Sequence, residues 1–349
     1  MITAGLLARA LLVLAALFAV ATAVLFGHGA WLNLARRGGA ARLDRGRAAL
    51  RTLLDAPIPA RADLDALRAL RTRLLVRLVV ELGPSLSGER RTRLVGVARE
   101  LGLLAAAERS CRSRFWWRRL RGVRLLSAIG AGEDAVPPLL DDPHPLVRAD
   151  AAEWAGAHPG PELAGLLLER LADPSGLARF SVQDSLIRMG PAASEPLRRF
   201  LETGSGPGLA PALRVAAGVA DARFLPAARW RCTHGHPAVR ARAAELVGAA
   251  GGAVGVDALT RLLDDPEAAV RTAAVRSLGA MGHWPAGPAV ARLLRDPAWE
   301  VRRAAGLALR GLGGPGQLLL RRALADADPF AADMARQVLD LPGGAGGAP

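Results

Sequence analysis

DPEAAVRTAAVRSLG, residues 265–279, and DPAWEVRRAAGLALRG, residues 296–311, are two copies of one phrase that recurs between residues 142 and 311. Three of the four intervals between the arginines of successive copies are 31 residues, and the fourth is 61, which leaves room for one degenerate copy around Arg214. A fixed period of this size indicates stacked supersecondary units. The arginines that give the period are Arg148, Arg179, Arg240, Arg271 and Arg302.

Each phrase predicts the start of a helix. Asp followed by Pro is typical of an N-cap and first turn, since the carboxylate accepts an orphan backbone N–H and proline has none to lose. Small apolar residues then follow four apart, as in Val270, Ala274 and Leu278. A glycine near the end of most copies, at Gly156, Gly248, Gly279 and Gly311, predicts the helix stop. Because a leucine-rich run separates the phrases, each unit is predicted to be two antiparallel helices.

The phrase D-P-x-x-x-V-R, followed by alanines and glycine, resembles the HEAT repeat family, specifically the short HEAT-like repeat first described in phycobilisome lyases. The resemblance covers roughly residues 120–340 and implies an all-α fold, an α-solenoid of HEAT-like helical hairpins in a right-handed superhelix. It implies little about function, because such solenoids include scaffolds, lyases, hydroxylases and DNA-binding proteins. In the last copy Asp333 stands where valine is expected, which suits a terminal cap.

Composition separates the chain into two electrostatic parts. Residues 36–130 hold 22 arginines against 8 acids, and residues 131–349 hold 23 arginines against 24 acids, so the net charge of +14 resides before the regular repeats. The chain has no lysine and no tyrosine, and 4% of its residues are aromatic against 51% hydrophobic. The core must therefore be built from Ala, Leu and Val, which favours helices. The arginine bias is typical of GC-rich coding in a bacterial protein.

The N-terminal segment predicts a membrane anchor. No charged residue occurs over residues 10–32, which as a helix cover about 35 Å, enough to cross a bilayer core. The alternative is a signal peptide cleaved after Ala21-Thr22-Ala23. The apolar run continues past that point, and six arginines follow within 20 residues, so the positive-inside rule places the C-terminal part in the cytoplasm. The anchor residues are Ala10, Leu11, Leu14, Leu17, Phe18, Leu25, Phe26 and Trp31.

We therefore expect a single-pass protein of the inner, cytoplasmic membrane with five segments. The arginines of residues 36–60 either bind anionic lipid or serve only as a topology signal. The segments are a transmembrane anchor (1–35), a basic juxtamembrane segment (36–60), divergent helices that begin the solenoid (61–119), HEAT-like repeats (120–341) and a disordered tail (342–349).

The densest basic and aromatic cluster lies at RSRFWWRRLRG, residues 112–122. Three interpretations remain open: a repeat helix whose tryptophans fill a junction, a contact with a membrane or protein partner, and a nucleic-acid groove. We expect no nucleic-acid partner, because an anchor restricts the protein to the membrane. The cluster consists of Trp116, Trp117, Arg112, Arg114, Arg118, Arg119 and Arg121.

The repeat arginines predict a structural ladder. Asp142, Asp173, Asp265 and Asp296 recur with the same period, so each guanidinium is expected to meet an aspartate or a helix-end carbonyl of the adjacent unit. The alternative is a basic stripe on the concave surface, but the near-neutral balance of residues 131–349 favours the ladder.

The sequence contains no G-x-S-x-G elbow, Walker loop or H-E-x-x-H motif. It also lacks the His-Glu dipeptides that the family resemblance implies for metal-dependent hydroxylases. Cys232, His234 and His236 lie close together without a fourth ligand, which is a weak metal pattern. We expect no cofactor and no catalytic residue. The sequence predicts a non-enzymatic scaffold or adaptor that binds a cytoplasmic or membrane-associated protein; the alternative is a lyase-type enzyme or subunit acting on a bound cofactor.

Overall fold

The computed structural model describes residue 22 and residues 43–55 and 61–341, and in these ranges every regular element is a helix. The described residues divide into two compact units, the first ending at Glu133 and the second beginning at Asp134. The prediction of an all-α solenoid is therefore confirmed. None of the described helices is long and apolar enough to cross a bilayer. The predicted anchor, residues 1–35, and the predicted tail, residues 342–349, lie outside the described residues.

The first unit contains six helices within its described residues. Residues 43–55 are helical within the predicted juxtamembrane segment. Between residues 61 and 111, within the segment predicted as divergent helices, the structure has four helices. Gly102, with φ of 69°, separates the last two, because a left-handed residue cannot continue a helix. The labelled helices are α2 (Arg61–Arg68), α3 (Thr72–Leu82), α4 (Gly88–Glu100), α5 (Leu103–Cys111) and α6 (Trp116–Ile129), with a 3-10 turn η1 (Gly83–Ser85) after α3.

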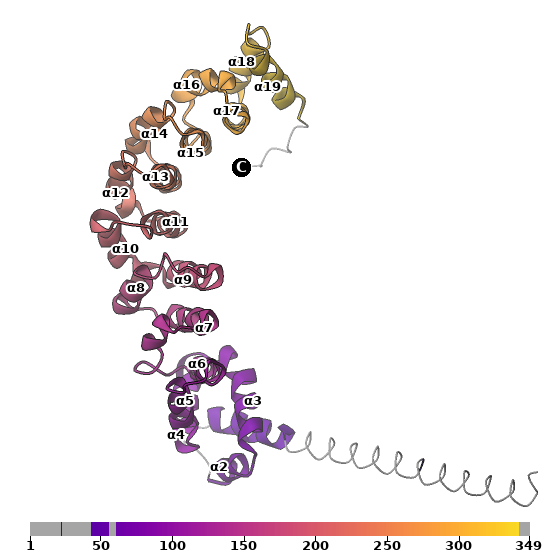
Figure 1. Cartoon of the computed structure of the whole chain (residues 1–349). Coiled ribbons are helices and arrows are strands. Elements are labelled where there is room, and N and C mark those ends of the chain that lie inside the picture. Colours follow the sequence, from indigo (N-terminus) through magenta and orange to yellow (C-terminus); the bar gives the residue numbers. More distant parts are fainter. Residues whose placement is uncertain (1–21, 23–42, 56–60, 342–349) are drawn as a thin grey trace, which may run out of the picture. The chain divides into compact units, whose positions relative to one another are not determined.

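In the second unit the phrases form one row of helices and the leucine-rich runs form another. Within this unit the row of phrases lies on the inner side of a curve (Figure 1). The inner row is α7 (Pro145–Gly156), α9 (Gly176–Met189), α11 (Leu209–Val219), α13 (Pro237–Ala250), α15 (Ala268–Ala280), α17 (Trp299–Gly311) and α19 (Pro329–Asp340). The outer row is α8 (Pro161–Leu168), α10 (Pro191–Thr203), α12 (Leu225–Arg231), α14 (Val256–Leu262), α16 (Gly287–Arg292) and α18 (Gly314–Ala323). Short 3-10 turns complete the unit: η2 (Pro137–Asp141), η3 (Ala222–Phe224), η4 (Ala253–Gly255), η5 (Trp284–Ala286) and η6 (Leu293–Arg295).

The small apolar stripe of each phrase is the core of the second unit. In α15, for example, Val270, Ala274 and Leu278 are all buried. Consecutive inner helices pack directly on one another, and alanine at the middle of the stripe permits the close approach. The last phrase keeps this stripe through Ala331, which is fully buried, whereas Asp333 is exposed. The prediction that Asp333 stands at the valine position is wrong, because Asp326, not Asp328, is the counterpart of the earlier phrase aspartates.

The aspartate that opens a phrase lies two residues before the helix N-cap. In α7 the N-cap is His144, whose backbone N–H donates to Asp142 Oδ1 at 2.8 Å. The same contact joins the N–H of Ala298 to Asp296 Oδ1 at 2.9 Å. The prediction that the aspartate is itself the N-cap is therefore wrong for these phrases, whereas in the last copy Asp328 is the N-cap of α19. Its carboxylate instead fixes the turn before the helix, where it can also meet a side chain of the preceding unit.

Three phrase glycines let neighbouring inner helices approach. A Cβ added to Gly248 would lie 2.6 Å from Ser277 Cβ, and one added to Gly279 would lie 2.7 Å from Ala308 Cβ. Gly156 meets the next inner helix in the same way. Gly248 and Gly279 lie inside α13 and α15, so the prediction that these two end their helices is wrong. Gly156 and Gly311 are the last residues of α7 and α17, as predicted.

Candidate functional site

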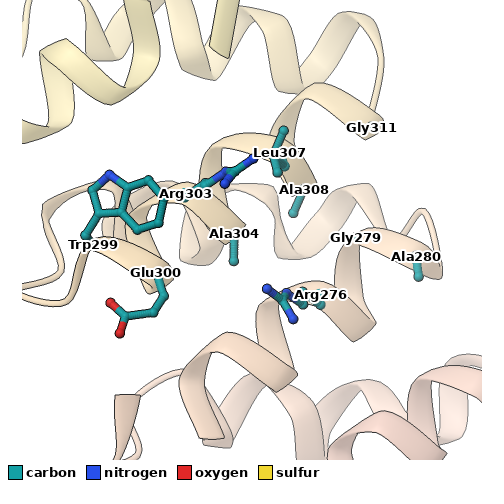
Figure 2. A pocket seen from close by; sticks show the side chains of 10 residues that line it. All are labelled: Arg276, Gly279, Ala280, Trp299, Glu300, Arg303, Ala304, Leu307, Ala308 and Gly311. Carbon is teal, nitrogen blue, oxygen red and sulfur yellow. The ribbon is translucent and has the colours of Figure 1, made fainter. Parts of the chain in front are cut away.

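An open groove of about 450 Å³ lies between α15 and α17, two consecutive helices of the inner row. Its floor consists of small residues, including Gly279, Ala304 and Ala308 (Figure 2). Trp299 and Leu307, both on α17, border it and expose 51% and 42% of their surface. Small residues on the floor allow a ligand to come close to both helix backbones, while the large side chains offer apolar contact.

Several exposed residues of the groove depart from the repeat. The position five residues after the ladder arginine holds an acid in α7, α9 and α13 (Glu153, Asp184 and Glu245), but Arg276 in α15 and Leu307 in α17. The position directly after the ladder arginine is Ala or Thr in most copies, but arginine at Arg303. These side chains are exposed, so the core does not require them. A set of exposed departures that gather in one groove is typical of a binding surface.

Two arginines with no acidic partner give the groove a positive charge. Among the described residues, neither Arg276 nor Arg303 lies within 4.0 Å of a carboxylate, whereas Arg188 and Arg242 of the same row pair with Asp184 and Glu245. The guanidinium of Arg303 lies 5.4 Å from the ring centroid of Trp299, which holds both side chains at the rim. Glu300 is the single acid that lines the groove. The groove therefore carries a net charge of about +1 and two free guanidinium groups.

The predicted ladder residues pair between successive helical repeats in three places. Arg148 donates from Nε to Asp173 Oδ2 at 2.7 Å and from Nη2 to Asp173 Oδ1 at 2.9 Å. Arg240 pairs with Asp265, and Arg271 with Asp296, by the same two bonds. In each pair the carboxylate is buried and the guanidinium largely so. The carbonyls that each arginine also binds belong to its own phrase, as in Arg148 Nη1 to Asp142 O at 2.8 Å, rather than to the adjacent unit.

Burial and hydrogen bonding both act on these carboxylates. The bidentate hydrogen bonds from Arg148 are the largest influence on Asp173, and together with the N–H of Ser175 they outweigh desolvation and lower the pKa of Asp173. For Asp265 desolvation is the largest single influence and raises the pKa, but the bonds from Arg240 and the N–H of Glu267 outweigh it and leave the pKa lowered. The Arg148–Asp173 and Arg240–Asp265 pairs therefore remain ionised at neutral pH.

The ladder is interrupted in the middle of the second unit and at its end. Arg179 donates to Asp173 O at 2.8 Å, but Gly204 stands where its carboxylate partner would be. In the degenerate copy Arg214 is an exposed residue of α11, and His234 takes the place of the aspartate, its Nδ1 accepting from the N–H of His236 at 3.0 Å. Arg302 donates to Asp296 O at 2.8 Å and its guanidinium lies over the Phe330 ring.

Arg231 lies where the ladder pair is missing, and no sequence pattern identified this residue. This arginine is only 5% exposed, and it donates from Nε to Leu201 O and from Nη2 to Gly204 O, both at 2.8 Å, and to Glu202 O at 3.2 Å. It therefore satisfies the carbonyls at the C-terminal end of α10, where the phrase aspartate is absent. Its position outside the period hid this role, and burial lowers its pKa.

The structure places the predicted basic and aromatic cluster at the start of α6, in the first unit. Trp116 and Trp117 are 37% and 48% exposed, and Arg112, Arg114 and Arg118 are exposed beside them. Arg121 is exposed on the next turn of the helix. Arg119 is half-buried and donates to Ser113 O at 3.0 Å and to Arg114 O at 3.1 Å.

The weak metal pattern at Cys232 is not assembled. Within the described ranges no three His, Cys, Asp or Glu side chains are placed to hold a metal ion. Cys232 is buried, and desolvation raises its pKa to about 11, so it is a neutral thiol. Cys111, in the first unit, is buried too, and desolvation raises its pKa to about 11. The predicted anchor residues (Ala10, Leu11, Leu14, Leu17, Phe18, Leu25, Phe26 and Trp31) lie outside the described residues.

A family model described as HEAT repeats matches residues 209–279 and 256–340, which include the whole groove. These residues are therefore similar to HEAT repeats. The match begins at the degenerate copy and includes the irregular α11.

Similar solved structures share the helical fold at low identity. A mutant of the karyopherin Kap121p is 14% identical, with 83% of this chain and 40% of that chain covered and a TM-score of 0.53. Kap121p bound to the extreme C-terminus of the protein phosphatase Cdc14p is also 14% identical (85% and 41% covered, TM-score 0.48). Human deoxyhypusine hydroxylase is 17% identical (79% and 98% covered, TM-score 0.31). No curated protein matches this chain significantly.

Proposed function

We propose that this protein is a non-enzymatic adaptor that holds a protein partner at a membrane through the inner row of its HEAT repeats. The observation that supports this most is the groove between α15 and α17, where exposed residues depart from the repeat and two arginines have no carboxylate partner among the described residues. Solenoids use such extended inner surfaces for binding. The membrane part of the proposal rests on the uncharged run of residues 10–32 and the arginines that follow it.

The chemistry of the groove selects an acidic segment with an apolar side chain. Arg276 and Arg303 offer planar donors that match carboxylates. Trp299 and Leu307 offer an apolar surface beside them. Because Gly279, Ala304 and Ala308 form the floor, an extended chain can lie between the two helices. The proposed ligand is therefore a short peptide segment with at least two Asp or Glu residues flanking a leucine or phenylalanine.

The test is binding of a labelled peptide in which glutamates flank one leucine, compared with the same peptide carrying glutamines. The purified full chain is expected to prefer the glutamate peptide. Replacing Arg276→Glu and Arg303→Glu is expected to weaken that binding about tenfold each, because each change removes an attraction and adds a repulsion. Fluorescence anisotropy of the peptide at low and raised salt measures both effects.

Matched controls separate the groove from the overall charge. Arg321→Glu and Arg322→Glu make the same charge change on the exposed face of α18 in the outer row, and Phe180→Ala removes an exposed aromatic of α9. All three are expected to leave peptide binding unchanged. Equal loss in the α18 variants would mean that the peptide responds only to net charge, and equal affinity for both peptides would exclude the acidic ligand.

A further inference from the structure

The start of α6 carries a second surface, which we call the α6 patch: Arg112, Arg114, Phe115, Trp116, Trp117 and Arg118. The rings of Phe115 and Trp117 stack with centroids 4.5 Å apart, and Trp116 meets Trp117 edge-on at 6.2 Å. The neighbouring Leu120 and Val123 are buried, so the other side of the helix belongs to the core of the unit. The exposed tryptophans are therefore held in place rather than being free to fold inward.

The stretch of sequence that contains the patch carries charge of one sign. From Arg109 to Gly132 the sequence holds seven arginines and no acid. The guanidinium of Arg114 lies 4.6 Å, and that of Arg118 5.4 Å, from the ring centroid of Phe115. Within the described part of the chain, no carboxylate lies within 4.0 Å of Arg112, Arg114 or Arg118, so their charges are available to an external anion.

We propose that the α6 patch binds the surface of an anionic lipid bilayer. Indole rings favour the headgroup zone of a bilayer, and arginines beside them attract anionic headgroups. A second reason rests on the proposed membrane attachment: only residues 33–42 separate the uncharged run of residues 10–32 from the helix over residues 43–55 of the same unit. Ten residues span at most about 35 Å, which keeps this unit near the membrane and raises the effective concentration of the patch there.

The experiment places the full chain in lipid nanodiscs of phosphatidylcholine alone or with added phosphatidylglycerol, both with brominated acyl chains. Quenching of tryptophan fluorescence reports indoles that lie near the acyl chains. The wild-type chain is expected to be quenched more in the anionic discs. Arg112→Gln, Arg114→Gln and Arg118→Gln combined are expected to remove this difference although they keep both tryptophans, and Trp116→Ala with Trp117→Ala to remove it as well.

The control is Trp230→Phe with Trp284→Phe, two exposed tryptophans of the second unit, which is expected to leave the difference unchanged. Equal quenching in the two kinds of disc, or a difference that survives the arginine variant, overturns the proposal. The proposal is also overturned by a combination of two results. These are that a single-stranded oligonucleotide binds the wild-type chain but not the arginine variant, and that lipid composition has no effect on quenching.

The proposed anchor and the patch can fail separately. If the chain does not enter the discs, the anchor has failed, and the same variants are then compared by flotation with phosphatidylglycerol vesicles. There the patch alone must account for binding, and removing three arginines is expected to lower partitioning on the order of 100-fold. Peptide binding in the α15–α17 groove is independent of either result.

Discussion

At the scale of single residues, the phrase aspartate serves two structures at once. Asp173 Oδ1 accepts the N–H of Ser175 at 2.8 Å within its own turn, and both carboxylate oxygens receive Arg148 from the preceding unit. One side chain thereby links the local geometry of a turn to the stacking of two neighbouring helical repeats. A buried pair that loses one partner leaves an uncompensated charge, which makes each such residue costly to replace.

This dual role predicts a pH dependence. Because the pKa of Asp173 is lowered in the folded protein, its contribution to the free energy of unfolding is complete above the unfolded-state pKa of about 4 and is lost as the pH falls through the folded pKa. Asp173→Asn is expected to destabilise the second unit by about 3 kcal/mol at neutral pH and by progressively less in acid. Urea unfolding of both chains over this pH range measures the difference.

Asp184→Asn is the matched control, since Asp184 is a half-exposed residue of the neighbouring helix whose ion pair with Arg188 is solvated. A constant difference between the wild-type chain and Asp173→Asn down to the acid limit would show that the carboxylate contributes nothing through its charge.

The ladder also shows what sequence can and cannot predict at this scale. Residue period alone pointed to the arginines and aspartates that now lie in contact at Arg148, Arg240 and Arg271. Period could not identify Arg231, because its carbonyl partners lie where the pattern is broken. The groove residues carried a readable signal in Trp299 and Arg303, which differ from the other copies at their positions, but only the fold shows that they share a groove with Arg276.

At the scale of helices, glycine controls the distance between neighbours in the inner row. The sequence suggested helix ends at Gly248 and Gly279 because glycine commonly follows the last turn. Helix ends and close helix contacts both favour glycine, so residue type does not separate them. The neighbours in the folded structure distinguish the two roles, since Ser277 and Ala308 occupy the space that a Cβ at Gly248 and Gly279 would need.

Gly279→Ala is therefore expected to destabilise the packing of α15 against α17 by about 1–3 kcal/mol, as overpacked cores do. Gly311→Ala is the matched change, because it is helical, lies in the same inner row and has nothing within 4 Å of the added Cβ. That variant is expected to be neutral or stabilising by up to about 1 kcal/mol. Thermal unfolding of the full chain compares the two. Equal effects would show that helix propensity, not contact, governs both sites.

At the scale of the whole molecule, the two units differ in charge and in surface. The first unit holds the α6 patch and most of the net positive charge, whereas the second is nearly neutral and holds the α15–α17 groove. The lipid contact and the protein contact that we propose therefore lie on different parts of one chain. The difference in net charge between the two parts was visible in the sequence, because counting charges needs no knowledge of the fold.

The proposed orientation has its own test at this scale. If residues 10–32 span the membrane with the arginines inside, protease added outside sealed cells is expected to leave the HEAT repeats intact, and protease added to inverted vesicles to digest them. A variant with Arg36, Arg37 and Arg42 replaced by glutamine and with arginines added before residue 10 moves the positive charge to the other side of the span. We expect part of the population of this variant to take the opposite orientation in the membrane. Digestion of the wild-type repeats from outside would contradict the orientation.

The interruption of the ladder between α9 and α13 bears on the mechanics of the second unit. Bidentate pairs resist sliding of one helical repeat on the next. They are present before the interruption, at Arg148, and after it, at Arg240 and Arg271. Across it, Gly204 and His234 replace two carboxylates, and Arg231 binds carbonyls at the C-terminal end of α10 instead. We therefore expect that a load applied along the second unit meets two stiffer segments joined by a more compliant section, and that the inner row bends most readily at α11.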